Sequence, residues 1–183
     1  MSKERIKKFE SKKRLKELEP YETLLSIGLE KNHVFCDIGA GTGIFSFAAS
    51  GITSNAIYAV EISDEMIELL MKRKNEGQVN QLEIIKVSDS ILPIDVNSVD
   101  RVLLSTVFHE LEKPSKMLKS IKRILKSDGL LAIIEFHKQD TPMGPPTNHR
   151  ISKSELEKIC LSNNFEKVKT FDLGENFYLS LFK

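Results

Sequence analysis

Short apolar runs alternate with helical patterns along most of this sequence, and that alternation constrains the fold more than any other feature. Such runs occur at 33–37, 56–61, 82–87, 99–105 and 130–136. Apolar residues at helical spacing, or helix start and stop signals, fill most of the intervals between them. Continuous apolar runs are typical of strands that are buried on both faces. The sequence therefore predicts a mostly parallel sheet with helices on both sides.

The C-terminal segment predicts how this sheet ends. Two further strands are expected at about 165–171 and 176–182, on either side of the turn DLGEN. Their connection is too short for a crossover helix, so one of the two should run antiparallel to the other strands. The complete expectation is an α/β fold in one domain, residues 1–183, with a Rossmann-like, doubly wound sheet of seven strands.

The expected helices carry start signals and helical spacing. Pro114 begins one helix, and Ser152 with Glu155 forms the capping box of another. The segment 64–74 has helical spacing, with four residues expected to face the core: Met66, Ile67, Leu70 and Met71. The longest irregular stretch, 137–150, contains three prolines and a glycine and should lie at the ligand end of the sheet.

Residues 1–19 are expected to form a basic helix. They contain eight Lys or Arg against four Glu, or +4 in a chain whose net charge is +1. The ordinary interpretation is a solvated helix face. A second interpretation is a flap or lid that meets an anionic substrate or RNA.

Other compositional features predict a cytoplasmic chain without a membrane partner. No apolar stretch approaches the roughly 18 residues that a membrane span needs, and the Lys-rich N-terminus does not resemble a secretory signal. Cys36 and Cys160 lie in apolar patterns far from any metal-ligand spacing, so both are expected to be reduced core residues.

The first expected strand is followed by an acid and three glycines. The stretch VFCDIGAGTG places Asp37 at the strand end and Gly39, Gly41 and Gly43 directly after it. Glycine permits positive φ and a close approach of backbone to a ligand, and the next helix directs free N–H groups toward the same space. A nicotinamide dinucleotide site would need a third small residue where this chain has Ile44.

Two more acids follow neighbouring expected strands. Glu61 ends the second strand, where a carboxylate can accept hydrogen bonds from both hydroxyls of a ribose. Asp89 follows the third strand and can accept a hydrogen bond from an exocyclic amine. Because the glycine loop contains no Lys or Arg, these acids and Asp37 predict a pocket for a positively charged nucleoside rather than for a phosphate.

Several motifs in order resemble those of class I S-adenosylmethionine-dependent methyltransferases, closest to the small ubiquinone/menaquinone-biosynthesis-like branch (methyltransferase type 11). The motifs are VFCDIGAGTG, AVEIS, VSDS, LPIDVNSVDRVLLSTVFHEL and LLAIIEFHK, and the likeness runs from about residue 20 to the C-terminus. The resemblance implies S-adenosylmethionine as cofactor. It also implies roles for individual residues: Asp37 with the backbone of Gly39, Gly41 and Gly43 for the methionine part, Glu61 for the ribose, Asp89 with Ser90 for the adenine, and Ser105 with Thr106 beside the sulfonium.

Some of these positions have an ordinary structural alternative. Gly43 could instead permit close packing of a helix on a strand, and Asp89 could cap a turn. Ile62 and Tyr21 are weaker candidates, for packing on the adenine or closing over the site, and core packing is their alternative.

A catalytic base is optional, because the sulfonium already supplies the driving force for transfer. His109 is the candidate base, with Glu135 and His137 as further possibilities, and its alternative role is a backbone hydrogen bond at a helix start. Arg150 could pair with an anionic acceptor or in a structural ion pair. No metal is expected, since His109, Glu110, His137 and His149 lack a ligand spacing such as H-x-x-x-H.

The acceptor is expected to be a small molecule. After the fourth strand the chain lacks the Asn/Asp-Pro-Pro-aromatic motif of enzymes that methylate bases, and it lacks the carboxylate of magnesium-dependent, catechol-type enzymes. Phe108 and Met143 would suit a partly hydrophobic acceptor. Two alternatives remain, namely an RNA or protein methyltransferase that docks through residues 1–19, and a non-catalytic S-adenosylmethionine-binding protein.

Overall fold

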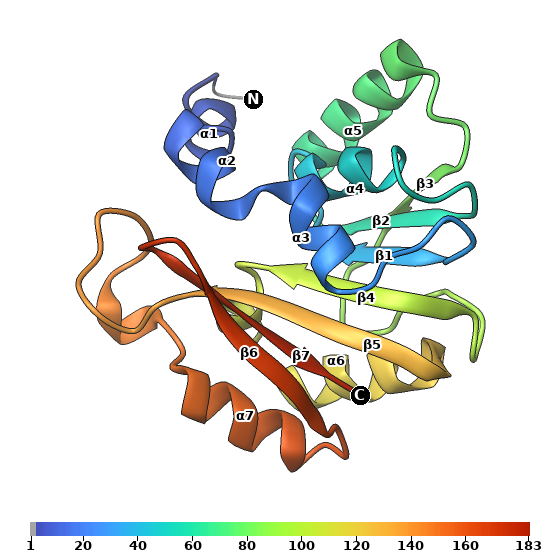
Figure 1. The fold of residues 1–183 in the computed structure, drawn as a ribbon. Coiled ribbons are helices and arrows are strands. Elements are labelled where there is room, and N and C mark those ends of the chain that lie inside the picture. The colour runs from blue at the N-terminus through green and yellow to red at the C-terminus, as the bar shows by residue number, and fades with distance from the viewer. Residues whose placement is uncertain (1–2) are drawn as a thin grey trace.

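The computed structural model describes residues 3–183 as strands and helices that alternate along the chain (Figure 1). The strands are β1 Phe35–Ile38, β2 Ile57–Glu61, β3 Leu82–Lys86, β4 Val99–Ser105, β5 Leu125–Phe136, β6 Lys167–Leu173 and β7 Phe177–Phe182. The helices are α1 Lys3–Phe9, α2 Lys12–Leu18, α3 Pro20–Ser26, α4 Ile44–Ala49, α5 Asp64–Gly77, α6 Pro114–Ile124 and α7 Lys153–Leu161. Short 3-10 helices occur at Phe108–Glu110 and Thr147–His149.

The strands form one seven-stranded sheet in the order β3-β2-β1-β4-β5-β7-β6. All pairings from β3 across to β5 are parallel, whereas β7 pairs antiparallel with both β5 and β6. β7 is therefore the one strand that runs against the others, as its short connection from β6 predicts. The strand order reverses at β1, whose neighbours are β2 and β4. The expected Rossmann-like, doubly wound fold is confirmed.

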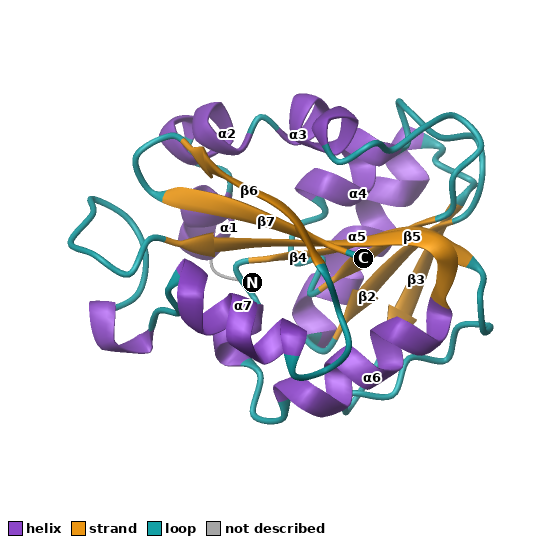
Figure 2. Cartoon of the chain, turned by 60° about the horizontal axis from the view of Figure 1, so that its bottom comes forward, coloured by secondary structure: helices purple, strands orange, loops and turns teal. Residues whose placement is uncertain are grey.

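Helices cover both faces of this sheet (Figure 2). One buried cluster joins a face of the sheet to α6 and α7, and the other joins the opposite face to α2, α3, α4 and α5. Cys36 and Cys160 are fully buried free thiols in the first cluster, as expected. Ser152 and Glu155 form the expected capping box at the start of α7. No helix within residues 3–183 is long and apolar enough to span a bilayer.

Two details of the expected helices are wrong. The basic N-terminal segment is not one helix, because Ser11 interrupts it and caps α2 by accepting a hydrogen bond from the backbone N–H of Arg14. Met71 is 50% exposed, although Met66, Ile67 and Leu70 of α5 are buried as expected. Met71 lies one position beyond Leu70, at the edge of the apolar stripe, and its side chain faces solvent.

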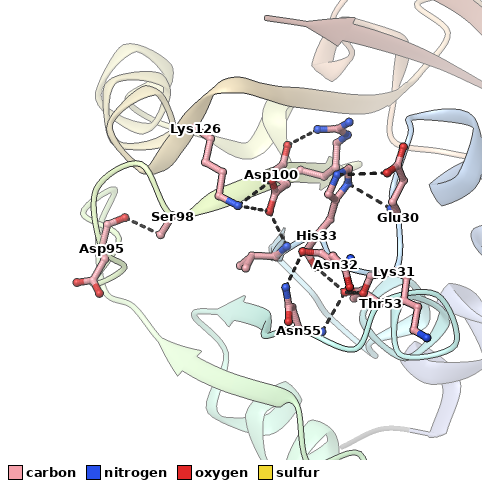
Figure 3. A network of polar contacts seen from close by, with 12 residues as sticks. Glu30, Lys31, Asn32, His33, Thr53, Asn55, Asp95, Ser98, Asp100 and Lys126 are labelled. Carbon is pink, nitrogen blue, oxygen red and sulfur yellow. Dashed lines mark hydrogen bonds and ion pairs between the residues drawn. The ribbon is translucent and has the colours of Figure 1, made fainter.

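A polar network fastens the amino ends of the central strands (Figure 3). The buried carboxylate of Asp100 accepts hydrogen bonds from the Val34 backbone N–H, at 2.7 Å, and from Lys126 Nζ, at 2.7 and 2.8 Å. The Thr53 hydroxyl donates to the backbone carbonyl of His33, beside the start of β1. This end of the sheet lies opposite the carboxyl ends of the parallel strands, where α/β proteins bind ligands.

Candidate active site

Two adjoining cavities lie at the carboxyl ends of β1, β2 and β4, where the strand order reverses. The smaller, of about 210 Å³, contains the glycine loop and is called the loop cavity here. The larger, of about 860 Å³, extends from the end of β2 toward α6 and is called the wide cavity. Both are lined by Gly39, Glu61, Ile62, Val107 and Glu110. They therefore form one continuous site in which a ligand can extend.

Asp37 is a buried acid at the end of β1. Its side chain lines the loop cavity, the residue is 2% exposed, and Oδ2 accepts a hydrogen bond of 2.6 Å from the Ser46 hydroxyl. Burial raises the pKa of Asp37 to about 7, and the bond from Ser46 offsets only part of that effect. No Lys, Arg or His of the described residues forms an ion pair with this carboxylate. It is therefore poised to receive a cation.

The glycine loop contains one open position and one packing position. At Gly41, with φ +55°, an added Cβ would meet only the Gly39 carbonyl oxygen at 3.8 Å, so this backbone faces open space. At Gly43, with φ +84°, a Cβ would lie 2.6 Å from Phe47 and 2.7 Å from Leu70. Gly43 lines neither cavity and serves the close packing of α4. The loop cradle is therefore made by the backbone from Gly39 to Thr42.

Glu61 ties the end of β2 to the glycine loop. Its Oε2 accepts a hydrogen bond of 2.7 Å from the Gly41 N–H, and its Oε1 accepts from the N–H groups of Ile62 and Ser63 at 2.8 and 3.0 Å. The residue is buried and lines both cavities. An ionised carboxylate has about four acceptor positions, so Glu61 keeps acceptor capacity for a ligand hydroxyl.

The residues expected near an adenine line the wide cavity. Ile62 is 65% exposed on its wall and is not part of the core. Asp89 and Ser90 also line it, and Asp89 Oδ1 accepts a 2.8 Å hydrogen bond from the Ile91 N–H. Asp89 therefore caps a turn and faces the cavity as well. Tyr21 lies on α3 near Gly51 and lines neither cavity.

Ser105 and Thr106 close the loop cavity at the end of β4. The Ser105 hydroxyl oxygen is buried and has no hydrogen-bond partner among the described residues. Thr106 has a left-handed backbone, with φ 57°, and its Oγ1 accepts a 2.9 Å hydrogen bond from Arg14 Nη2. An unpartnered buried hydroxyl and an uncommon backbone conformation are both frequent at binding sites.

Arg14 is the residue in this cavity that sequence reasoning missed. The composition of residues 1–19 predicts a solvated cation at this position, yet Arg14 is only 9% exposed and lines the loop cavity. Burial lowers the pKa of Arg14 to about 10, and the negative charge of Glu135 partly opposes that effect. The sequence does contain one signal, since Arg14 stands four positions before the buried Leu18 and thus on the same face of α2.

The structure places His109 outside the cavities of the glycine loop. Its ring lines a third cavity of about 410 Å³ together with His149 and Arg150. Nδ1 lies 2.7 Å from Oε2 of the fully buried Glu135, whose Oε1 accepts the His109 backbone N–H at 3.1 Å. Burial alone would lower the pKa of His109, but the hydrogen bond and charge of Glu135 outweigh it, so the pKa is raised.

The contacts of His137 and Arg150 serve the fold rather than the candidate site. His137 Nε2 lies 3.5 Å from Asp172, and the residue lines none of the three cavities. The guanidinium of Arg150 is buried and donates to Thr141 Oγ1 and to four backbone carbonyls of the Pro-rich stretch, those of His137, Gln139, Met143 and Pro145. Arg150 thus fixes that loop. In residues 3–183, no group of three or more His, Cys, Asp or Glu could hold a metal ion.

The residues present fit the cofactor that the sequence predicts. An open backbone cradle at Gly41, an unpaired buried carboxylate at Asp37 and an unpartnered hydroxyl at Ser105 share the loop cavity. These groups suit the polar, cationic end of S-adenosylmethionine. The wide cavity, with Ile62 and Asp89 on its wall, has room for the adenine.

Curated relatives support the same conclusion for the core of the chain. The ubiquinone/menaquinone biosynthesis C-methyltransferase UbiE of Pasteurella multocida is 30% identical over 114 residues, which cover 61% of this chain and 42% of that protein. UbiE of Haemophilus ducreyi is 31% identical over 114 residues, which cover 61% of this chain and 44% of that protein. The chain spans about half the length of the curated relatives it matches.

Solved structures match nearly the whole chain. A crystal structure of an S-adenosylmethionine-dependent methyltransferase from Aquifex aeolicus superposes with a TM-score of 0.92 and 26% identity, covering 98% of this chain and 96% of that one. The [4+2]-cyclase SpnF has a TM-score of 0.79 at 14% identity, covering 91% and 80%, and shares the fold alone.

The family model described as methyltransferase domain matches residues 36–133, which include most of β1, the glycine loop, β2, β3, β4 and most of β5. This match covers more than half of the sequence. It confirms the family and the cofactor that the motifs predict. The chain therefore belongs to the class I S-adenosylmethionine-dependent methyltransferases, in the type 11 branch with the UbiE proteins.

Proposed function

We propose that this chain transfers the methyl group of S-adenosylmethionine to a small-molecule acceptor by in-line displacement. The observation that carries the proposal is Asp37, a buried carboxylate beside the open cradle of the glycine loop that forms no ion pair with a Lys, Arg or His of the described residues. Such a group costs stability in the free protein and is satisfied by a cationic ligand.

The proposed contacts follow the lining of the two cavities. Asp37 receives the ammonium of the methionine part, and Glu61 receives a ribose hydroxyl. Asp89 and Ser90 receive the adenine, on which Ile62 packs. The bound cofactor supplies an activated methyl group on a cationic sulfur. The task left to the protein is to orient the acceptor and exclude water. Ser105 and Thr106 line the loop cavity, which supports the proposal that they lie beside the sulfonium.

His109 is the proposed general base, and Glu135 supports this role. When His109 donates its Nδ1–H to Glu135, Nε2 becomes the nitrogen that can accept a proton. The cavity beside it has apolar walls at Phe108, Leu111 and Ile151, and Leu111 also lines the wide cavity. A partly hydrophobic acceptor could therefore extend from the cofactor cavities toward His109 along this side. The names of the UbiE relatives describe carbon methylation in quinone biosynthesis, and a flat, conjugated acceptor of that kind would fit the proposal.

α1 and α2 are proposed to act as a lid. Phe9 and Arg14 from this segment line the loop cavity, so the N-terminal helices cover the expected methionine part. Lys7, Lys8 and Lys12 point outward and are exposed, which leaves a basic outer face.

The deciding experiment is incubation of the protein with methyl-labelled S-adenosylmethionine and a metabolite extract, followed by identification of the labelled product. We expect label in a small organic molecule, at a rate that is insensitive to salt. Label in RNA or protein, with transfer that weakens steeply with salt and on removal of residues 1–19, would instead support docking through the basic segment. Tight cofactor binding without any labelled product would contradict the proposal, and the [4+2]-cyclase shows that this fold occurs in a protein named for other chemistry.

A further inference from the structure

Arg14 is a buried cation that forms no ion pair with any residue the structure describes. Its guanidinium makes one hydrogen bond, from Nη2 to Thr106 Oγ1 at 2.9 Å, and its Nε has no partner. No carboxylate in the part of the chain that the structure describes forms an ion pair with it. Arginine is almost never so buried unless it is paired, because desolvation of an unpaired charge costs several kcal/mol. An anionic ligand at this position would therefore stabilise the buried guanidinium.

The structure holds this arginine in place from both ends of α2. Before the helix, Glu10 pairs with Arg73, at 3.1 Å between Oε2 and Nη2, and Arg73 also donates to the Thr42 carbonyl of the glycine loop at 2.8 Å. Near the end of the helix, Glu17 accepts the side-chain amide of Asn176 at 2.7 Å and its backbone N–H at 2.9 Å. Helix α2, and with it the backbone of Arg14, is thus held against the site before any ligand binds.

The surroundings of Arg14 restrict where a partner can approach. Its guanidinium carbon lies 5.7 Å from the ring centre of Phe136 and 5.2 Å from that of Phe177. Glu135 is the nearby carboxylate, and its charge partly opposes the lowering of the Arg14 pKa, but its two oxygens contact the backbone and ring of His109 and form no ion pair with Arg14. Apolar rings therefore flank the guanidinium, and the open direction is the loop cavity that Arg14 lines.

The charges in the loop cavity match an amino acid. Asp37 and Arg14 both line it, together with the backbone from Gly39 to Thr42. The methionine part of S-adenosylmethionine carries an ammonium and a carboxylate on one carbon. A planar guanidinium suits a carboxylate because it can donate two parallel hydrogen bonds. A cation that shares this cavity with a bound sulfonium would oppose cofactor binding unless an anion lay between them.

We infer that Arg14 binds the carboxylate of the methionine part while Asp37 receives its ammonium, so that helix α2 closes on the cofactor itself. This inference rests on the proposed function. Arg14 is then the residue that selects an amino-acid-bearing nucleoside over one that lacks the carboxylate.

The test is calorimetry with two ligands, S-adenosylmethionine and its decarboxylated analogue, on the whole chain. We expect Arg14→Gln to weaken S-adenosylmethionine roughly 10- to 100-fold and the analogue by less than about threefold. Arg14→Lys keeps the charge but cannot donate two parallel hydrogen bonds, so its loss of S-adenosylmethionine affinity should be intermediate. Lys13→Gln is the matched control. It removes a charge from the next position of α2, where the side chain is half exposed and pairs with Glu175, and should change neither affinity.

Two results would overturn the inference alone. One is an Arg14→Gln variant that binds S-adenosylmethionine as the wild type does, and the other is a variant that loses both ligands equally. Thermal unfolding without ligand checks that the variant is folded, and we expect no loss of melting temperature because an unpaired buried charge is removed. A wild-type chain that binds neither ligand would instead contradict the proposed function.

Discussion

The two ends of the sheet differ in how far their buried charged side chains are paired. At the amino end, the carboxylate of Asp100 is paired with Lys126 and with a backbone N–H, and neighbouring side chains fasten the loops around it (Figure 3). At the carboxyl end, Asp37 and Arg14 are also buried, yet neither forms an ion pair within the part of the chain that the structure describes. Paired charges hold the strands together, whereas unpaired ones reduce stability until a ligand arrives. The difference separates residues that serve the fold from residues that serve binding.

The largest expected effect is a pH dependence of stability caused by Asp37. Its pKa is about 7 in the folded chain, against an ordinary value of 3.8, so the folded state keeps a proton that the unfolded state has released. The resulting stabilisation is complete below about pH 4 and disappears as the pH rises to about 7, on the order of 4 kcal/mol in all. Denaturant unfolding at pH 5 and pH 8 should show a larger decrease for the wild type than for Asp37→Asn. Equal decreases in the free energy of unfolding for the wild type and the variant would show that the charge of Asp37 is already stabilised in the folded chain.

The next effect concerns the amino end. Asp100→Ala leaves the Val34 N–H and the Lys126 ammonium without their acceptor, and we expect the free energy of unfolding to fall by about 2 to 4 kcal/mol. Affinity for S-adenosylmethionine, measured on the folded variant by calorimetry, should stay within about twofold of the wild type. A large loss of affinity with little loss of stability would reverse the contrast between the two ends.

Glu61→Ala tests the ligand end, where it should lower stability as well as affinity because three backbone N–H groups lose their acceptor. We expect it to lower S-adenosylmethionine affinity roughly 10- to 100-fold, or about 1.5 to 3 kcal/mol, because charge-assisted hydrogen bonds are lost. Glu83→Ala, which removes an exposed acid from β3, is the control and should bind normally. If both variants bind equally well, the ribose is held elsewhere.

The smallest effect tests a paired carboxylate at the ligand end. His109→Ala removes the partner of Glu135, and if His109 is the base, turnover should fall about tenfold or more while cofactor affinity is retained. His149→Ala, in the same cavity, should leave turnover unchanged. Since the pKa of His109 is raised, wild-type turnover should also decline as the pH falls and the imidazole is protonated. Unchanged turnover in His109→Ala would remove it from the mechanism.

Local patterns predicted the fold and the acids of the site. Parallel strands end at one edge, so Asp37, Glu61 and Asp89 could be assigned to one site from their positions after apolar runs. The positions of Arg14 and His109 depend on long-range packing, which local patterns do not predict. Arg14 meets Thr106 across 92 positions of the chain, and only the break at Ser11 and the anchors of α2 bring them together. The position of His109 depends equally on a buried partner from β5, Glu135.

The most direct test of the central claim is calorimetry of S-adenosylmethionine and of ATP against the wild type and Asp37→Asn at one pH. A site built around an unpaired buried carboxylate should bind the sulfonium nucleoside, bind ATP far more weakly, and lose roughly 10- to 100-fold in S-adenosylmethionine affinity in the variant. Tight binding of ATP, or a variant that binds S-adenosylmethionine as the wild type does, would contradict it.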